Sequence, residues 1–563
     1  MKDLVFEPGV HTLSQPIVGS VRISNSGEGE VVLRLEGGGT LINLNDPSAE
    51  VLLQGVALEG GAPVLSIHAG RVEMTDCTIR RPSEPAERDP ANWCEDASAW
   101  ADPNGLICLL GDDAELVARG CSIQGPRVEA YGDEKHYPEV VRAGGSEFYS
   151  DWTAKWGTLC GVYVAAGQLE ATDCSITEQI MDGILVCSGS VSVRKSSLSD
   201  NGFCGLRCLG FYPNQLVCLD ECTLQGNHRH GILAENGASP RIRDCTIREN
   251  LDDGMYLVRG ANPEVVGCRF ERNLGRGVHA EGFYKDDECE EVTRGSFENC
   301  HFSFNTYLGI EIELSSCNPT FNDCHVQGNG RTGIHTSGGG RFIGCTVLEN
   351  ASCGVEIGDG SPVFLDCRIS RNAGHGAHLE DGSNPSFIAC RFDGNAEGGI
   401  SITDDEGDGW SGVTALGYFR DCDVSNNGKV GIKIMSGANP TLHACKVALN
   451  QGPGILVDGK TEEAKAQELD WIETMGTIEQ CMIHDNAEHG VMVTQGGSPC
   501  LRDCRTHGNH GYGIFVAGPG EGSNKRSRTT IVACEQDRNG LGGILIEEGN
   551  DVSVRFCTPE GNA

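Results

Sequence analysis

Short apolar segments alternate with polar turns at a regular interval along most of the chain. The repeating unit is clearest between Cys222 and Asn562, where a strand-like segment holds a Cys, an Asn follows five residues later and a Gly nine residues later. A second segment rich in Val, Ile and Leu follows the Gly, and successive Cys residues are mostly 23 residues apart, as at Cys245 and Cys268. This pattern predicts two short β-strands and no helix in each unit.

A fixed period in this range indicates a solenoid, in which each strand lies parallel to its copy in the next coil. Parallel crossovers are almost always right-handed, so the predicted fold is all-β: a single right-handed parallel β-helix of about twenty coils over residues 1–563. The period is interrupted, and loop insertions are predicted, at residues 80–105, 125–160, 281–296, 403–417, 458–476 and 518–530.

The repeated residues have structural explanations. Cys and the residue two positions later are expected to point inward and form an apolar stack. Asn is expected at a bend, in a left-handed backbone conformation, with its amide bonded to the Asn of the neighbouring coils. Gly is expected where the chain bends and a Cβ would collide. We therefore assign no catalytic role to these three positions.

A row of outward-facing ionisable residues is expected at the second position after each repeat Gly, because the position before it faces inward. In the middle of the chain this row alternates His and Glu: His279, Glu311, His335, Glu356 and His378. Neighbours about 4.8 Å apart can share hydrogen bonds, so these five are the candidate acid/base residues. The alternative is a solvated sheet face stabilised by pairs of opposite charge. Their spacing selects no metal, and we predict neither a metal site nor a cofactor.

The predicted insertions contain every Trp of the chain: Trp93, Trp100, Trp152, Trp156, Trp410 and Trp471. Trp is enriched at binding interfaces because its large ring buries much apolar area and keeps a polar N–H. These six are the candidate binding residues. The alternative is that they hold the loops against the coils.

The formal net charge is −37 and the pI is near 4.7. Such an acidic surface repels phosphate backbones and anionic lipid, so we predict no nucleic-acid partner and no membrane insertion. The chain holds 28 Cys. The thiols of the repeated Cys point in the same direction rather than toward each other, so they are expected to stay reduced. Residues 1–10 lack the features of a signal peptide and no apolar run is long enough to span a bilayer, so a cytoplasmic location is expected.

Residues 437–455, with the sequence GANPTLHACKVALNQGPGI, resemble the carbohydrate-binding and sugar-hydrolase repeats of pectin-lyase-like β-helix proteins. Such repeats occur in alginate epimerases, periplasmic copper-maturation proteins and eukaryotic F-box β-helix proteins, and the Cys-containing variant is most similar to the last group. The resemblance covers roughly residues 160–563 and implies the fold. An F-box-like segment and the Asp-Pro-His-Glu motif of alginate epimerases are both absent from the sequence, so neither activity is carried over.

Two short motifs resemble those of polygalacturonases, hydrolases that use paired carboxylates. They are Asp252-Asp253 and Gly374-His375-Gly376. In that family the motifs occupy adjacent coils, whereas five predicted coils, about 24 Å, separate them here. They cannot share one sugar, and the match is set aside.

We therefore expect a non-enzymatic scaffold or binding module. It would present an acidic β-helix face and Trp-bearing loops to protein partners, at an uncapped end or through the insertions, within a larger assembly. The alternative is a polysaccharide-active lyase, hydrolase or epimerase that uses the His and Glu residues, with a carbohydrate as its partner. Fold alone does not decide between the two.

Overall fold

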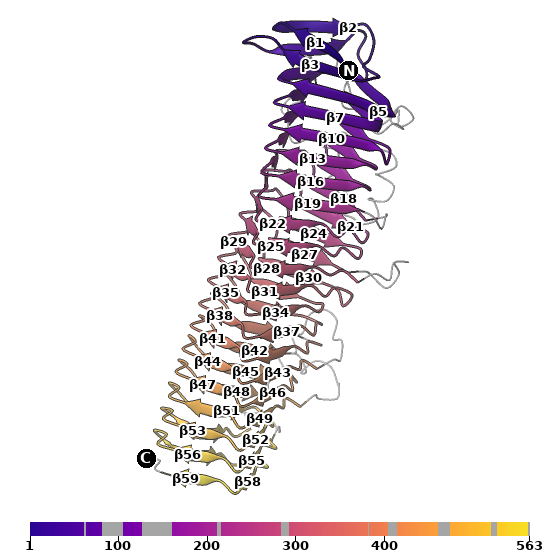
Figure 1. The fold of residues 1–563 in the computed structure, drawn as a ribbon. Helices are drawn as coiled ribbons and strands as arrows, with labels where there is room; N and C mark the ends of the chain where they lie inside the picture. Colours follow the sequence, from indigo (N-terminus) through magenta and orange to yellow (C-terminus); the bar gives the residue numbers. More distant parts are fainter. Residues whose placement is uncertain are drawn as a thin grey trace, which may run out of the picture. The chain divides into compact units, whose positions relative to one another are not determined.

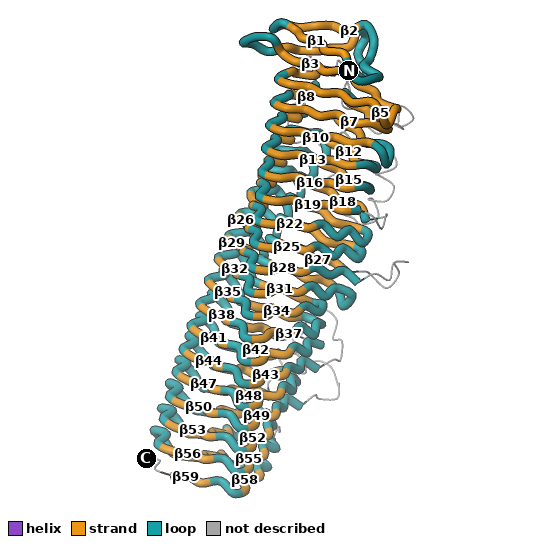
Figure 2. Tube along the Cα trace, in the orientation of Figure 1, coloured by secondary structure: helices purple, strands orange, loops and turns teal. Residues whose placement is uncertain are grey.

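The computed structural model describes residues 1–60, 63–81, 105–125, 160–210, 215–282, 292–380, 382–403, 414–459, 473–519 and 526–560. Every helix or strand assigned within these ranges is a β-strand, and Figure 2 shows the strands joined by short loops. The all-β prediction is confirmed. The chain divides into two compact units, Met1–Gly275 and Arg276–Ala563, and each is described by itself.

A typical coil consists of three short strands, so the prediction of two was wrong. One coil of the second unit contains β36 (Val355–Ile357), β37 (Val363–Leu365) and β38 (Arg368–Ser370). The segment around the Cys is split because the residue just before it, Asp366, has a left-handed backbone with φ of 52°. This bend separates two strands and leaves Cys367 buried at their junction.

Each strand lies parallel to, and in register with, its counterpart in the next coil. In the strands that follow the repeat Gly, Val355 pairs with Ala377 and Glu356 with His378, and the strands before the Cys pair in the same way. Each unit therefore has three parallel sheets, which appear as stacked rows in Figure 1. We call them the Gly sheet, the pre-Cys sheet and the post-Cys sheet, after the repeat residue next to their strands.

The strands of the second unit follow this scheme throughout. Its Gly sheet consists of β27 (Val278–Glu281), β30 (Ile310–Glu313), β33 (Ile334–Thr336), β36, β39 (Ala377–Leu379), β42 (Ile400–Thr403), β45 (Ile432–Met435), β48 (Ile455–Asp458), β51 (Val491–Thr494), β54 (Tyr512–Val516) and β57 (Gly542–Ile546). Its pre-Cys sheet consists of β28 (Ser296–Glu298), β31 (Thr320–Asn322), β34 (Arg341–Ile343), β37, β40 (Ser386–Ile388), β43 (Tyr418–Arg420), β46 (Thr441–His443), β49 (Thr477–Glu479), β52 (Cys500–Arg502), β55 (Thr530–Val532) and β58 (Ser553–Arg555). Its post-Cys sheet consists of β29 (His301–Ser303), β32 (His325–Gln327), β35 (Thr346–Leu348), β38, β41 (Arg391–Asp393), β44 (Asp423–Ser425), β47 (Lys446–Ala448), β50 (Met482–His484), β53 (Arg505–His507), β56 (Glu535–Asp537) and β59 (Thr558–Glu560).

The first unit has the same three sheets, and two of its long strands run through both the Gly and pre-Cys sheets: β5 (Ile42–Gln54) and β7 (Leu65–Thr75). Its other Gly-sheet strands are β9 (Ile107–Leu109), β12 (Val162–Val164), β15 (Ile184–Val186), β18 (Leu206–Leu209), β21 (Ile232–Glu235) and β24 (Met255–Val258). Its other pre-Cys strands are β1 (Lys2–Phe6), β3 (Val21–Asn25), β10 (Ala114–Arg119), β13 (Gln168–Thr172), β16 (Ser190–Arg194), β19 (Leu216–Asp220), β22 (Arg241–Arg243) and β25 (Glu264–Val266). Its post-Cys strands are β2 (Gly9–Leu13), β4 (Val31–Leu35), β6 (Val56–Glu59), β8 (Thr78–Arg80), β11 (Ser122–Gln124), β14 (Ser175–Thr177), β17 (Ser197–Ser199), β20 (Thr223–Gln225), β23 (Thr246–Arg248) and β26 (Arg269–Glu271).

A column of stacked Phe rings lies in the core of the second unit. Successive rings lie 4.5–5.3 Å apart between centroids, with interplanar angles of 10° or less, and all are fully buried. In-register pairing of the pre-Cys strands places each ring against the next, and burial of so much aromatic area stabilises the unit. The members of this Phe column are Phe297, Phe321, Phe342, Phe364, Phe387 and Phe419.

The Asn ladder predicted from the sequence is present. Nδ2 of Asn329 donates to Oδ1 of Asn350 at 3.0 Å, and Nδ2 of Asn350 donates to Oδ1 of Asn372 at 3.0 Å. The left-handed conformation predicted for the Asn was wrong, because it falls one residue earlier, as at Glu349 with φ of 57°. With the bend there, the backbone N–H of Asn350 also donates to Oδ1 of Asn372, and Nδ2 of Asn350 donates in addition to the carbonyl oxygen of Val326 in the previous coil, so the Asn links both neighbouring coils.

The Gly and Cys positions behave as predicted. A Cβ at Gly333 would lie 2.6 Å from Nδ2 of Asn350 and 2.6 Å from Cγ1 of Val347, so only Gly fits beside the ladder. The thiol of Cys345 donates to the carbonyl oxygen of Phe321 at 3.4 Å, which ties it to the previous coil. All the cysteines in the described ranges are free thiols.

The six predicted Trp binding residues and much of each predicted insertion lie outside the described residues. The assignment of binding to these Trp residues stays a prediction.

Candidate functional site

The five candidate acid/base residues lie side by side on the Gly sheet of the second unit. Each is the second residue of its strand, in β27, β30, β33, β36 and β39. The residues that flank them along each strand are buried core residues, so the five lie on the outer face of the sheet. The register pairs consecutive members, and we call the set the His/Glu row: His279, Glu311, His335, Glu356 and His378.

Glu311 is the centre of a network of ionisable groups. Its Oε2 accepts a hydrogen bond from Nε of Arg276 at 2.5 Å, and its Oε1 lies 3.4 Å from Nδ1 of His335. Nε2 of His279 lies 4.0 Å from Oε2 of Glu311 and 3.6 Å from Oε2 of Glu313. His279 and Glu311 are only 8% and 7% exposed, so this end of the row is not the solvated face that alternation along the strand suggests.

The surroundings keep the carboxyl groups of this network ionised. Burial acts to raise the pKa of Glu311, but the hydrogen bond from His335 and the charge of Arg276 outweigh it, and the pKa lies below its ordinary value. The hydrogen bond from His279 is the main reason that the pKa of Glu313 is also lowered. Burial disfavours the protonated form of His335, yet the hydrogen bond to Glu311 prevails and raises the pKa of His335.

The other end of the row is more open. Oγ1 of Thr332 donates to Oε2 of Glu356 at 2.8 Å. Nε2 of His378 lies 3.5 Å from Oε1 of Glu380, and this hydrogen bond lowers the pKa of Glu380. The ring of His375 stacks on His378, with 5.9 Å between centroids. Burial, together with the charge of His378, lowers the pKa of His375 to about 4.

This geometry limits the chemistry that the row can perform. A carboxyl group serves as a general acid near neutral pH only when its pKa is raised. The pKa values of Glu311, Glu313 and Glu380 are all lowered instead, so these groups are suited to accept hydrogen bonds and to bind positive charge. His335, with its raised pKa, is the member of the row suited to carry a proton near neutral pH.

Three groups of described side chains have the composition of metal ligands, with ligand atoms within 4.8 Å of one another: His279, Glu311 and Glu313; His230, Asp252 and Asp253; and His484, Asp485 and His507. In the first, Arg276 already bonds to Oε2 of Glu311, which disfavours a cation. In the second, Nε of Arg229 donates to Nε2 of His230 at 3.2 Å, which places the ring proton on Nδ1, facing Asp253. In the third group, Nδ1 of His484 lies 2.8 Å from Oδ2 of Asp485, and among the described residues no arginine or lysine is hydrogen-bonded to the two rings.

A buried charge cluster on the Gly sheet of the first unit was missed by the sequence analysis. Nε of Arg207 donates to Oε1 of Glu235 at 2.8 Å, and Oδ1 of Asp182 accepts the backbone N–H of Cys204 at 3.1 Å. Burial raises the pKa of Asp182 to about 6, against the charge of Arg207. The three side chains are buried, which fits a structural role.

The residues that were missed share two positions in the repeat. Asp182 and Arg276 come one residue before the repeat Gly, and Glu235, Glu313 and Glu380 come four residues after it. The second position lies two residues beyond the His/Glu row along the strand and therefore faces the same side, whereas the first lies before the strand begins and its direction does not follow from alternation.

The described part of the chain contains no helix that could span a membrane.

No curated protein matches the sequence at a significant level. Solved structures similar to the chain include the A-module of a mannuronan C-5 epimerase from Azotobacter vinelandii, with 13% identity over 67% of this chain and 91% of that one and a TM-score of 0.31. A periplasmic alginate epimerase has 11% identity over 75% and 89% of the two chains and a TM-score of 0.34. A pectate lyase has 11% identity over 53% and 71% and a TM-score of 0.29.

The sequence also matches the family model of the right-handed β-helix region at residues 160–285, 286–409, 411–524 and 465–563. These matches extend over more than half of the chain, and they cover the coils that carry the His/Glu row, the Asn ladder and the Phe column. The stacked parallel strands of both units agree with them. The chain belongs to the right-handed parallel β-helix family.

Proposed function

We propose that the protein is a non-enzymatic binding module and that the His/Glu row, with the carboxylates beside it, binds a positively charged segment of a protein partner. The observation that supports this most is the surplus of carboxylates around the row. Glu311, Glu313, Glu356 and Glu380 lie there, and Arg276 is the guanidinium bonded among them. Such a surplus attracts lysine and arginine side chains.

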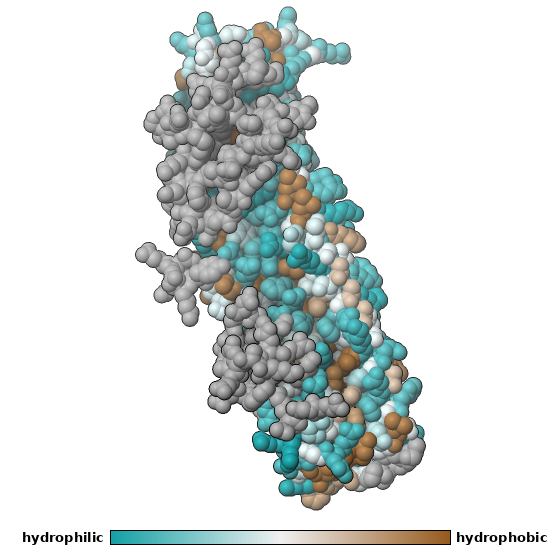
Figure 3. Space-filling model, turned by 180° about the vertical axis from the view of Figure 1, so that it is seen from behind, coloured by the Kyte–Doolittle hydropathy of each residue, from teal (hydrophilic) through white to brown (hydrophobic). Residues whose placement is uncertain are grey.

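Three of these carboxylates are accessible to a partner. The side chains of Glu313 and Glu380 are 33% and 37% exposed, and Glu356 is half-buried. The net charge of −37 adds a long-range attraction for cationic partners. On the face drawn in Figure 3, the described residues are mostly hydrophilic and the apolar patches are small and separate. This favours recognition by charge over recognition by a broad apolar surface.

In this proposal the Trp-bearing insertions supply additional contacts to the same partner. The protein works in a reducing, cytoplasmic compartment, in keeping with the free thiols throughout the described ranges.

The test uses the full chain, a fluorescent oligo-lysine peptide as the probe, and two triple variants. Glu313→Gln/Glu356→Gln/Glu380→Gln removes one charge from the row and two charges beside it. Asp366→Asn/Asp421→Asn/Asp503→Asn removes three exposed charges from the bends before ladder Cys residues of the same unit. Each exposed pair contributes roughly 0.5 kcal/mol, so we expect the first variant to bind roughly tenfold more weakly.

The matched control should bind nearly as tightly as the wild type, because its three charges lie outside the Gly sheet that carries the His/Glu row, while the overall charge changes equally in both variants. Equal weakening by the two variants would mean that the peptide senses only the net charge, and the proposed site would be rejected.

One observation favours a second candidate, a polysaccharide-active enzyme. His335, with its raised pKa, faces the ionised Glu311, which is an arrangement that can transfer a proton. This candidate predicts turnover of a polysaccharide that is lost in Glu311→Gln and in His335→Ala. A broad glycan screen without turnover by the wild type would remove it.

A further inference from the structure

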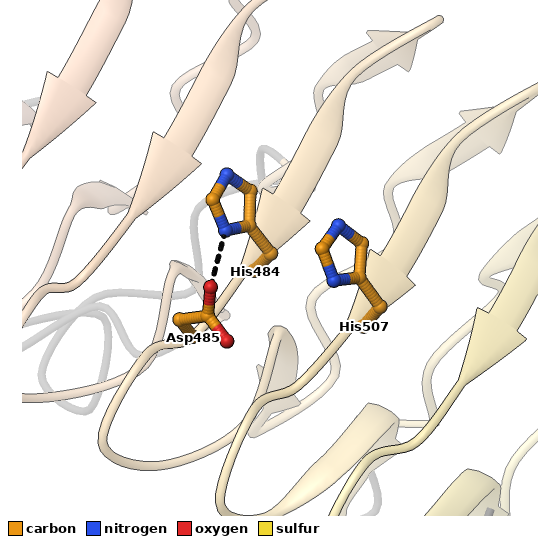
Figure 4. Close-up of side chains that lie close together, drawn as sticks. All are labelled: His484, Asp485 and His507. Carbon is orange, nitrogen blue, oxygen red and sulfur yellow. Dashed lines mark hydrogen bonds and ion pairs between the residues drawn. The ribbon is translucent and has the colours of Figure 1, made fainter.

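A pair of histidines on the post-Cys sheet of the second unit lies apart from the His/Glu row. His484 ends β50, His507 ends β53, and the strand register places them directly side by side. Their rings are stacked with 4.8 Å between centroids and an interplanar angle of 3°. Figure 4 shows both rings projecting from the same side of the two strands, with Asp485 beside them.

The carboxylate of Asp485 is held against this pair by the backbone. Its own N–H donates to the carbonyl oxygen of His507 at 3.1 Å, and its Oδ2 lies 2.8 Å from Nδ1 of His484. Gly508 leaves room for it, since a Cβ there would lie 2.3 Å from Oδ1 of Asp485. The side chain of His484 is 16% exposed and that of Asp485 is 50% exposed, so solvent ions can reach the group.

The charges around the pair are close to balanced, with a small negative surplus. Arg538 pairs with Asp537 at 3.0 Å, and Arg505 lies 3.9 Å from Glu535 and 3.8 Å from Asp537. Each nearby arginine is thus matched by a carboxylate, and the charge of Asp485 is left over. Two imidazoles beside a carboxylate are a favourable setting for a divalent cation.

We propose that His484, Asp485 and His507 form a binding site for a divalent transition-metal ion of the zinc class. Their ligand atoms all lie within 4.8 Å of one another. Bonds of about 2.1 Å require the ligand atoms to be about 3.4 Å apart in a tetrahedral site, which modest rotation of the two partly exposed rings achieves. Water completes the coordination. This site is independent of the proposed function of the His/Glu row.

The same unit contains a natural control. His301 and His325, on β29 and β32, are also stacked in register, with 4.9 Å between centroids and an interplanar angle of 19°. No carboxylate joins them in a group with ligand spacing among the described residues. If the carboxylate of Asp485 is a ligand, Zn²⁺ should bind to the pair His484 and His507 and not to the pair His301 and His325.

The experiment measures diethyl pyrocarbonate modification of each histidine in the full chain by mass spectrometry, with and without Zn²⁺. We expect Zn²⁺ to protect His484 and His507, and His325 to stay as reactive as before. Asp485→Asn keeps the size of the side chain at this bend. In this variant, the Zn²⁺ concentration that gives the same protection should be at least roughly tenfold higher than in the wild type. In His507→Gln, protection of His484 should be lost.

Circular dichroism of each variant confirms that the fold is kept. Equal modification of His484 with and without Zn²⁺ would overturn the proposal. Protection that is the same in Asp485→Asn and in the wild type would overturn it as well, because the carboxylate would then not be a ligand.

Discussion

The ring of His375 lies just before β39, where burial and the neighbouring His378 lower its pKa to about 4 from an ordinary value of 6.5. An unfolded chain therefore takes up this proton at a higher pH than the folded protein does. The stability that the neutral ring contributes is present above pH 6.5 and is lost as the pH falls toward 4. Acid should weaken the fold at this residue.

We predict that His375→Gln loses less stability in acid than the wild type does. Between pH 7 and pH 4, the drop in the free energy of unfolding should be smaller by about 2–3 kcal/mol, measured by urea denaturation. The exposed His510 provides the control, and His510→Gln should keep the wild-type pH dependence. An unchanged acid-side loss in His375→Gln would contradict the burial described here.

At the scale of a strand, the Phe column is a continuous block of buried aromatic area in the second unit. Phe364 of β37 contacts Phe342 at 4.6 Å and Phe387 at 4.5 Å between ring centroids and is fully buried. Replacing it leaves a cavity with a ring on either side, which the stiff coils cannot close.

We predict that Phe364→Ala lowers the free energy of unfolding by about 3–5 kcal/mol, while Phe364→Leu, which keeps most of the volume, lowers it by about 1–2 kcal/mol. Chemical denaturation of both variants measures this. If the two substitutions have similar and small effects, the rings are not packed as a column.

The strand pattern also shows what could be learned from the sequence. The period, the inward Cys, the Asn ladder and the bend at Gly were all predictable, because each coil must repeat the same contacts with the next. The third strand of each coil was missed, because the left-handed residue before the Cys has no fixed identity: it is Asp366 in one coil, Ala389 in the next and Ala444 in another. A conformation that several residue types adopt leaves little signal in one sequence.

The candidate site was only partly predictable for a related reason. Alternation along the strands predicted which His and Glu residues form the His/Glu row. It could not show that Arg276 and Glu313 reach sideways to bond with Glu311 and His279, because the reach of long side chains across a sheet does not follow from the repeat.

For the molecule as a whole, all the described cysteines are free thiols, but they differ in exposure. Most of the described cysteines are buried, while Cys187, Cys218, Cys500 and Cys557 are partly exposed. Burial raises the pKa of the buried Cys108 to about 12, which suppresses the reactive thiolate.

We predict that a thiol reagent added to the native protein modifies the four partly exposed cysteines well before the buried ones, and that the ladder cysteines react only when the protein unfolds. Mass spectrometry of peptides after timed labelling distinguishes them. Rapid modification of Cys345 or Cys367 in the native protein would show that the coils open readily.

The central claim is that neighbouring coils are in register, so that His335 faces an ionised Glu311 on a charged binding surface. This hydrogen bond contributes stability below the ordinary pKa of His335, and that contribution is lost as the pH rises through the higher pKa of the folded protein. The most direct test is an NMR titration of protein carrying labelled histidine, with the His335 signal assigned by its absence in His335→Gln.

We expect His335 to titrate above 6.5, its ordinary value, and its pKa to fall in Glu311→Gln, where the negative charge is removed and the shape is kept. A pKa at or below 6.5 that does not respond to Glu311→Gln would contradict both the register of these coils and the ion-paired row built on it.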